Sequence, residues 1–66
     1  MELGKVILER RKSMGLSQDD VAAFSGVSRR FITAIENGKL SVSLEKVLAV
    51  TTSLGLDLRF EIRKER

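Results

Sequence analysis

Serine and glycine residues divide most of this chain into short amphipathic segments, and this division limits what the chain can fold into. The segments are about residues 3–14, the stretch between Ser17 and Gly26, Arg29 to Asn37, and the stretch between Ser43 and Gly55. Serine is a preferred residue at the start of a helix, and glycine is preferred just after its end. Apolar residues recur within the segments at helical spacing. The pattern predicts four helices.

Three of the predicted helices have a clear apolar stripe. The stripes are Leu3, Val6, Ile7 and Met14 in the first; Phe31, Ile32 and Ile35 in the third; and Leu44, Val47, Leu48, Thr51 and Leu54 in the fourth. We expect these side chains to face a common core.

After Gly55 the hydrophobic period changes from that of a helix to that of a strand. The apolar residues Leu56, Leu58, Phe60 and Ile62 alternate with the charged residues Asp57, Arg59, Glu61 and Arg63. A strand buried on one face has this pattern. The chain contains no second candidate strand, so we expect pairing with a second molecule. The predicted fold is mainly all-α, with four to five helices in residues 1–55 and a dimerisation strand in residues 56–66 that forms an intermolecular two-stranded antiparallel sheet.

The charges in this strand favour one register. A register centred on Phe60 places Arg59 opposite Glu61 of the partner and Leu58 opposite Ile62. Registers centred on Arg59 or on Glu61 place like charges opposite each other, which destabilises a sheet. We therefore predict the register centred on Phe60.

Length and composition exclude several classes of protein. The chain has 66 residues with no Cys and no His, so it has no disulfide, no thiolate zinc site and no histidine-based catalysis. We expect no metal, no cofactor and no enzymatic activity. Domains of this size usually need a further stabilising element. With disulfides and metals excluded, oligomerisation is the expected one.

The charge balance is mildly basic. Twelve Lys and Arg residues against nine Asp and Glu residues give a net charge of +3, which weakly favours a polyanionic partner. No apolar run is long enough to span a membrane, and two charges lie within Met1–Ile7, where a signal peptide would be apolar. We expect an intracellular protein.

The stretch from Leu16 to Lys39 carries a family resemblance. It reads LSQDDVAAFSGVSRRFITAIENGK and resembles the phage-repressor-type (XRE/Cro-like) helix-turn-helix family, written roughly LTQxxLAxxxGVSxxxIxxxExGK. The resemblance implies a lambda-repressor-like DNA-binding domain. With its C-terminal strand, the chain is also similar to HipB-type antitoxins, whose dimers pair such strands. Val21 and Phe24 depart from the pattern, Phe24 at a position that is usually polar.

The predicted recognition helix begins with Arg29 and Arg30. In helix-turn-helix proteins this end points at the bases, and arginine pairs well with guanine. We expect base contacts from Arg29, Arg30, Thr33 and Ala34, and the family resemblance implies the same positions. The alternative for the two arginines is solvated charge beside a helix cap.

Other polar residues flank this helix and are expected to contact the DNA backbone. They are Ser17, Gln18, Ser28, Asn37 and Lys39. Ser17 and Ser28 are also expected to cap helices, and both roles can coexist. Asp19 and Asp20 would repel phosphate, so we expect them on the solvent side of the second helix.

Arg11 and Glu36 form an expected structural pair. Arg11 lies on the apolar stripe of the first helix, where an unpaired charge is costly. Glu36 lies on the inner edge of the third helix, and the family resemblance implies a buried salt bridge between the two. The alternative is that Arg11 reaches solvent within a basic cluster.

The function expected from these features is that of a homodimeric repressor of transcription bound to palindromic double-stranded DNA. We expect it in the bacterial cytoplasm, associated with the nucleoid when bound to DNA. Similarity to HipB-type antitoxins implies autoregulation of a toxin-antitoxin operon and a HipA-type kinase toxin as partner. Phe24 could contact such a partner, and the favoured alternative is an ordinary exposed or dimer-packed residue. Two alternatives are a stand-alone phage or restriction-modification regulator and a protein-interaction module that has lost DNA binding.

Overall fold

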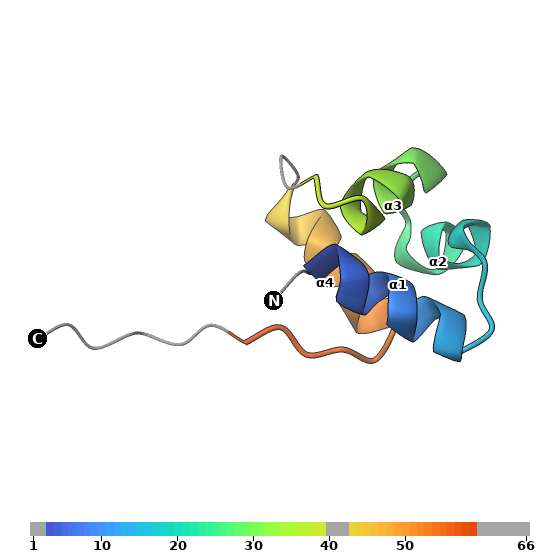
Figure 1. Ribbon diagram of the computed structural model, residues 1–66. Coiled ribbons are helices and arrows are strands. Elements are labelled where there is room, and N and C mark those ends of the chain that lie inside the picture. The colour runs from blue at the N-terminus through green and yellow to red at the C-terminus, as the bar shows by residue number, and fades with distance from the viewer. Residues whose placement is uncertain (1–2, 40–42, 60–66) are drawn as a thin grey trace, which may run out of the picture.

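The computed structural model describes residues 3–39 and 43–59, and these ranges contain four helices and no strand (Figure 1). The helices are α1 (Leu3–Ser13), α2 (Gln18–Ser25), α3 (Arg29–Glu36) and α4 (Leu44–Ser53). The predicted four helices are confirmed, with ends within a residue or two of those expected. No helix in the described ranges has the length and apolar character needed to cross a membrane.

Local capping interactions explain where three of the helices begin. The hydroxyl oxygens of Ser17, Ser28 and Ser43 each accept a hydrogen bond from the backbone N–H three residues later. After α2 the chain turns at Gly26, whose φ of 74° lies in the left-handed region that costs glycine little. This turn leads directly into the N-cap of α3, so α2 and α3 are joined by only three residues.

The helices bury one apolar core, in which α2 contacts α3 and α4, and α1 contacts α3. The core consists of Ile7, Val21, Ala22, Ile32, Ile35, Val47, Val50 and Leu54. It holds α3 from one side and leaves the other side of that helix facing outward.

The predicted apolar stripes are wrong at three positions. Met14, Leu44 and Leu48 are exposed, at 43%, 55% and 38%. Met14 lies beyond the last residue of α1, where the chain has already turned away. In α4 the helix is rotated so that Val50 lies in the core, which moves Leu44 and Leu48 to the edge of the buried face.

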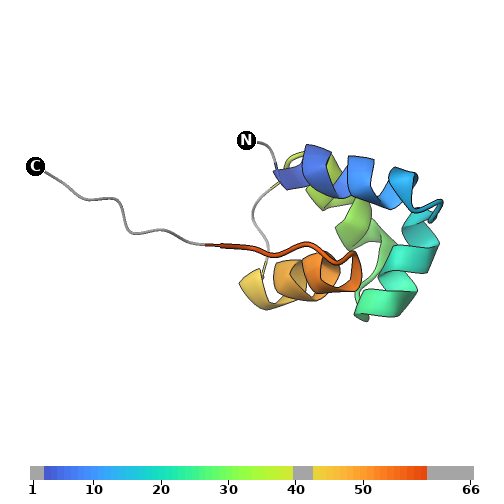
Figure 2. The same ribbon diagram turned by 90° about the horizontal axis from the view of Figure 1, so that it is seen from below.

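The segment after Gly55 doubles back along α4 (Figure 2). Leu56 and Leu58 are half-buried against the core, whereas Asp57 and Arg59 are exposed, so the alternation predicted for these four residues is confirmed. They form no strand in the single chain. The other expected dimerisation residues, Phe60, Glu61 and Ile62, lie outside the described residues. Pairing into an intermolecular sheet therefore stays a prediction.

Candidate nucleic-acid interface

The first turn of α3 presents two arginines to solvent. Arg29 and Arg30 directly follow the N-cap Ser28 and are both exposed. Thr33 and Ala34 lie about one turn further along α3 and are half-buried. This end of α3 therefore combines a cluster of positive charge with short side chains behind it.

The two serines expected at the DNA backbone act as helix caps in the structure. Ser17 Oγ accepts from the backbone N–H of Asp20 at 2.9 Å, and Ser28 Oγ accepts from that of Phe31 at 3.1 Å. Both serines are exposed. A hydroxyl that accepts one hydrogen bond keeps its own proton to donate, so capping and a phosphate contact are compatible.

Asn37 and Lys39 lie at the opposite end of α3 from the two arginines. Asn37 is the C-cap of the helix, and Lys39 follows two residues later; both are exposed. The candidate backbone contacts therefore extend from Ser28, at the start of α3, to Asn37 and Lys39 at its end.

Gln18 connects the first turn of α2 to α3. Its Oε1 accepts hydrogen bonds from Thr33 Oγ1 at 3.2 Å and from Arg29 Nε at 3.4 Å. Its Nε2 donates to Glu36 Oε1 at 3.0 Å. Gln18 was expected only as a contact to the DNA backbone, but in the structure it also ties together three residues of α3.

Arg11 and Glu36 form a bidentate ion pair between α1 and α3. Arg11 Nε lies 2.7 Å from Glu36 Oε2, and Arg11 Nη2 lies 3.1 Å from Glu36 Oε1. Arg11 Nη1 donates to the carbonyl oxygen of Leu16 at 2.9 Å. All three guanidinium nitrogens are therefore used, which is what a buried arginine requires.

The electrostatics of this pair keep both groups charged. Burial alone would raise the pKa of the Glu36 carboxyl, but hydrogen bonds from Arg11 and Gln18 and the charges of Arg11 and Lys12 hold that pKa below its ordinary value. The hydrogen bond to Glu36 raises the pKa of Arg11. The charged pair thus fixes Glu36 as the acceptor that orients Gln18.

Asp19 and Asp20 have different surroundings, although both were expected simply to face solvent. Asp20 Oδ2 accepts from the backbone N–H of Ser17 at 2.9 Å, and this hydrogen bond lowers the pKa of Asp20. Asp19 Oδ1 instead lies 3.8 Å from Arg29 Nε. Both acids are exposed as expected, but Asp19 pairs with a candidate base-contacting residue.

A second arginine of α1, which no sequence pattern singled out, fixes the end of α4. Arg10 Nε donates to the carbonyl oxygen of Leu54 at 2.8 Å. This carbonyl is one of those left without a partner at a helix C-terminus. The contact anchors the place where the chain leaves α4 and enters the tail.

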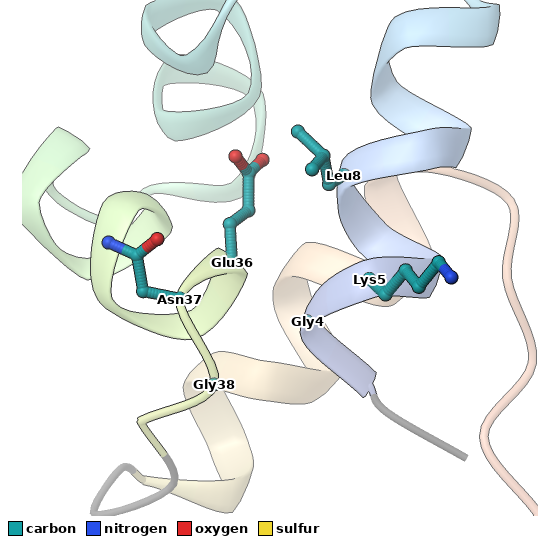
Figure 3. Close-up of a pocket in the computed structure, with 6 residues that line it drawn as sticks. All are labelled: Gly4, Lys5, Leu8, Glu36, Asn37 and Gly38. Carbon is teal, nitrogen blue, oxygen red and sulfur yellow. The ribbon is translucent and has the colours of Figure 1, made fainter.

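An open hollow of about 370 Å³ lies between α1 and the C-terminal end of α3 (Figure 3). It is lined by Gly4, Lys5, Leu8, Glu36, Asn37 and Gly38. The Glu36 carboxylate, which is paired with Arg11, stands at its edge and points along the gap between the two helices. The described residues contain no cluster of side chains suited to hold a metal ion.

The arrangement of α2, a three-residue turn and an outward-facing α3 defines a helix-turn-helix protein. The model of the Helix-turn-helix family matches residues 7–60, which is most of the chain. The chain therefore belongs to this phage-repressor-type family of DNA-binding transcription regulators, and the expectation drawn from the motif is confirmed.

Three relatives agree with this assignment. An uncharacterized HTH-type transcriptional regulator, y4mF, of Sinorhizobium fredii is 37% identical over 57 residues, covering 86% of this chain and 75% of its own length. An uncharacterized HTH-type transcriptional regulator of Methanothermobacter thermautotrophicus is 40% identical over 50 residues, which cover 76% of this chain and 72% of the relative. The ImmF control region 10 kDa protein of Bacillus phage phi105 is 33% identical, covering 86% and 63%.

Proposed function

We propose that this protein is a sequence-specific repressor of transcription that binds a palindromic operator in double-stranded DNA as a homodimer. The observation that carries the proposal is the exposed pair Arg29 and Arg30 in the first turn of α3, with Gln18 hydrogen-bonded to Arg29. A helix inserted by this end into the major groove places both guanidinium groups at base edges, where arginine pairs bidentately with guanine. Thr33 and Ala34 then face the groove with side chains short enough to allow close approach.

Backbone contacts position the helix in this proposal. Gln18, Ser17 and Ser28 contact phosphates near the N-terminal ends of α2 and α3, where exposed backbone N–H groups favour anions. Asn37 and Lys39 contact a phosphate at the far end of α3. Contacts at both ends of α3 fix its tilt and its register on the duplex.

Dimerisation through residues 56–66 sets the spacing of two such helices. Its support is the alternation of half-buried Leu56 and Leu58 with exposed Asp57 and Arg59. The exposed Leu44 and Leu48 of α4 also offer apolar surface for the strands of a dimer to cover. A two-fold dimer reads a palindrome when its recognition helices lie about 34 Å apart, one turn of DNA.

Fluorescence anisotropy tests the proposal on DNA from upstream of the gene and on a scrambled duplex, at several salt concentrations. The upstream duplex is expected to bind more tightly, with an affinity that falls as salt rises. The double variant Arg29→Ala/Arg30→Ala should lose the preference. The control Lys12→Ala/Lys46→Ala removes the same charge from α1 and α4, and should keep the preference. Equal binding of both duplexes by the unmodified protein would refute the proposal.

A more specific form of the proposal is a HipB-type antitoxin that represses its own operon and binds a HipA-type kinase toxin. Its support is Phe24, an aromatic residue of α2 that is 64% exposed. Co-purification with the product of the neighbouring gene tests it, with Phe24→Ser expected to weaken the complex without changing DNA binding.

A neighbouring gene of phage or restriction-modification type would instead favour a stand-alone regulator. Binding to protein but not to DNA would favour an interaction module.

A further inference from the structure

Arg29 is held on one edge of its guanidinium group by the preceding helix. Its Nε lies 3.4 Å from Gln18 Oε1 and 3.8 Å from Asp19 Oδ1. Gln18 is itself fixed by Glu36, but Asp19 has no other polar side-chain contact among the described residues. Among the described residues, the only charged partner of Arg29 is thus the carboxylate of Asp19, which has no other assigned role.

We propose that Asp19 is a positioning residue that sets the DNA sequence preference of Arg29. The inference rests on the proposed function, since it concerns how Arg29 meets a base. Asp19 does not itself contact the DNA bases in this proposal. It acts by orienting and partly neutralising the arginine.

The geometry of the guanidinium group gives the first reason. An arginine carries its donors in a rigid planar fork, with Nε on one edge and two Nη groups at the end. The hydrogen bond from Nε to Gln18 Oε1 and the attraction of the Asp19 carboxylate hold this plane from the side of α2. Neither Nη group of Arg29 has a hydrogen-bond partner among the described residues. Both are thus left to donate to O6 and N7 of one guanine, the bidentate pairing that discriminates best among bases.

The balance of charge gives the second reason. An unpaired arginine is attracted to any phosphate, and such contacts add affinity without sequence information. A carboxylate beside Arg29 lowers that attraction and repels neighbouring phosphates. A guanine edge still binds, because its two acceptors match the two Nη groups. Asp19 therefore weakens non-specific binding more than specific binding.

The exposure of the pair makes this role separable from folding. The side chains of Arg29 and Asp19 are 65% and 71% exposed. Ion pairs of this kind contribute little to the stability of a protein. Replacing Asp19 by Asn keeps the shape of the side chain and removes one surface charge at the N-terminus of α2. The variant is therefore expected to fold, with a melting temperature only slightly lowered.

The test selects binding duplexes from a pool of random sequence with the unmodified protein and four variants in parallel. Asp19→Asn and Arg29→Ala probe the two partners, and Asp19→Asn/Arg29→Ala probes their coupling. Glu45→Gln is the matched control, since Glu45 is an exposed acid in the first turn of α4 rather than α2. Sequencing the selected duplexes gives the base preference at every position, and anisotropy gives the affinity for the best and for a random duplex.

Arg29→Ala is expected to reduce a guanine preference at one position of each half-site by about five-fold or more. Asp19→Asn should reduce the guanine preference at the same position by about three-fold and raise the affinity for the random duplex. The double variant should show the same preference as Arg29→Ala alone. Glu45→Gln should leave that position unchanged. An unchanged preference in Asp19→Asn, or relaxation at positions that Arg29→Ala does not affect, would overturn the inference. Failure of the unmodified protein to enrich any sequence would instead refute the proposed function.

Discussion

Gly4 of α1 lies directly against the carbonyl oxygen of Ile35 in α3. A Cβ built on Gly4 would overlap this oxygen and would crowd the backbone of Glu36 as well. The obstructing atoms belong to the backbone of α3, so no side-chain rotation relieves the overlap. The absence of a side chain at position 4 thus sets how closely α1 approaches the C-terminal end of the recognition helix (Figure 3).

Gly4→Ala is accordingly expected to destabilise the protein by about 1–3 kcal/mol, the usual cost of overpacking. Alanine favours a helix over glycine by about 1 kcal/mol, so Gly4→Ala would stabilise the protein if α3 did not press against this position. Urea denaturation measures the change. Lys5→Ala is the control, because Lys5 is the exposed neighbour in the same helix, and it should change stability by less than about 0.5 kcal/mol. An increase in stability on Gly4→Ala would show that α1 can shift away from α3 without losing stabilising contacts.

The helices and their ends were predictable from the sequence because they depend on local interactions. A serine that caps a helix and a glycine that ends one act on backbone groups only a few residues away, as at Ser28 and Gly26. The contact between Gly4 and Ile35 was not predictable, since it depends on how two helices cross. The same applies to Leu44 and Leu48, because periodicity defines an apolar stripe but does not settle which edge of it is covered.

The candidate site was predictable only residue by residue. Arg29 and Gln18 each follow from a position in the motif, but the hydrogen bond between them depends on the angle at which α2 meets α3. The pair of Arg29 with Asp19 has the same origin. Sequence spacing alone does not bring these residues together, although the short turn between the helices was a usable signal.

Breaking the ion pair of Arg11 and Glu36 from one side is expected to cost about 3–5 kcal/mol, because it leaves a buried charge without its partner. Arg11→Met and Glu36→Leu each test this by urea denaturation. The free energy of unfolding of the double variant should be closer to that of the original protein than that of either single variant, since two apolar side chains need no charge partner. Costs that simply add in the double variant would show that the two residues stabilise the fold independently.

Stability is expected to fall in acid partly through Glu36. Its pKa is lowered in the folded protein, so its contribution is fully present above the ordinary value of 4.5 and is lost as the pH falls through the folded pKa. Urea denaturation from pH 7 to pH 3 measures this. The double variant Arg11→Met/Glu36→Leu lacks the titrating group and should lose less stability below pH 4.5. Parallel curves for both proteins would assign the acid sensitivity to other carboxyls.

Arg10→Met is expected to destabilise the protein by about 1 kcal/mol, because the carbonyl of Leu54 loses a charged donor at the end of α4. Methionine keeps much of the aliphatic length of the side chain, so the change isolates the hydrogen bond. Lys12→Met is the control, an exposed cation of the same helix without this contact. Hydrogen exchange at the amides of Leu54 and Gly55 should accelerate in Arg10→Met only. Equal exchange in both variants would mean that the end of α4 is held by other contacts.

The register proposed for the dimer predicts a specific rescue. With the paired strands centred on Phe60, Arg59 of one subunit faces Glu61 of the other, so Arg59→Glu places two acids opposite each other at two symmetric positions. Analytical ultracentrifugation should show a dimer several-fold weaker, and Arg59→Glu/Glu61→Arg should restore it by exchanging the charges. Arg30→Glu, a reversal on the recognition helix, is the control and should leave dimerisation unchanged. If the double variant dimerises as weakly as Arg59→Glu, this register is refuted. If none of the three variants changes the dimer, the interface lies elsewhere. The exposed Leu44 and Leu48 of α4 would then be the next residues to replace.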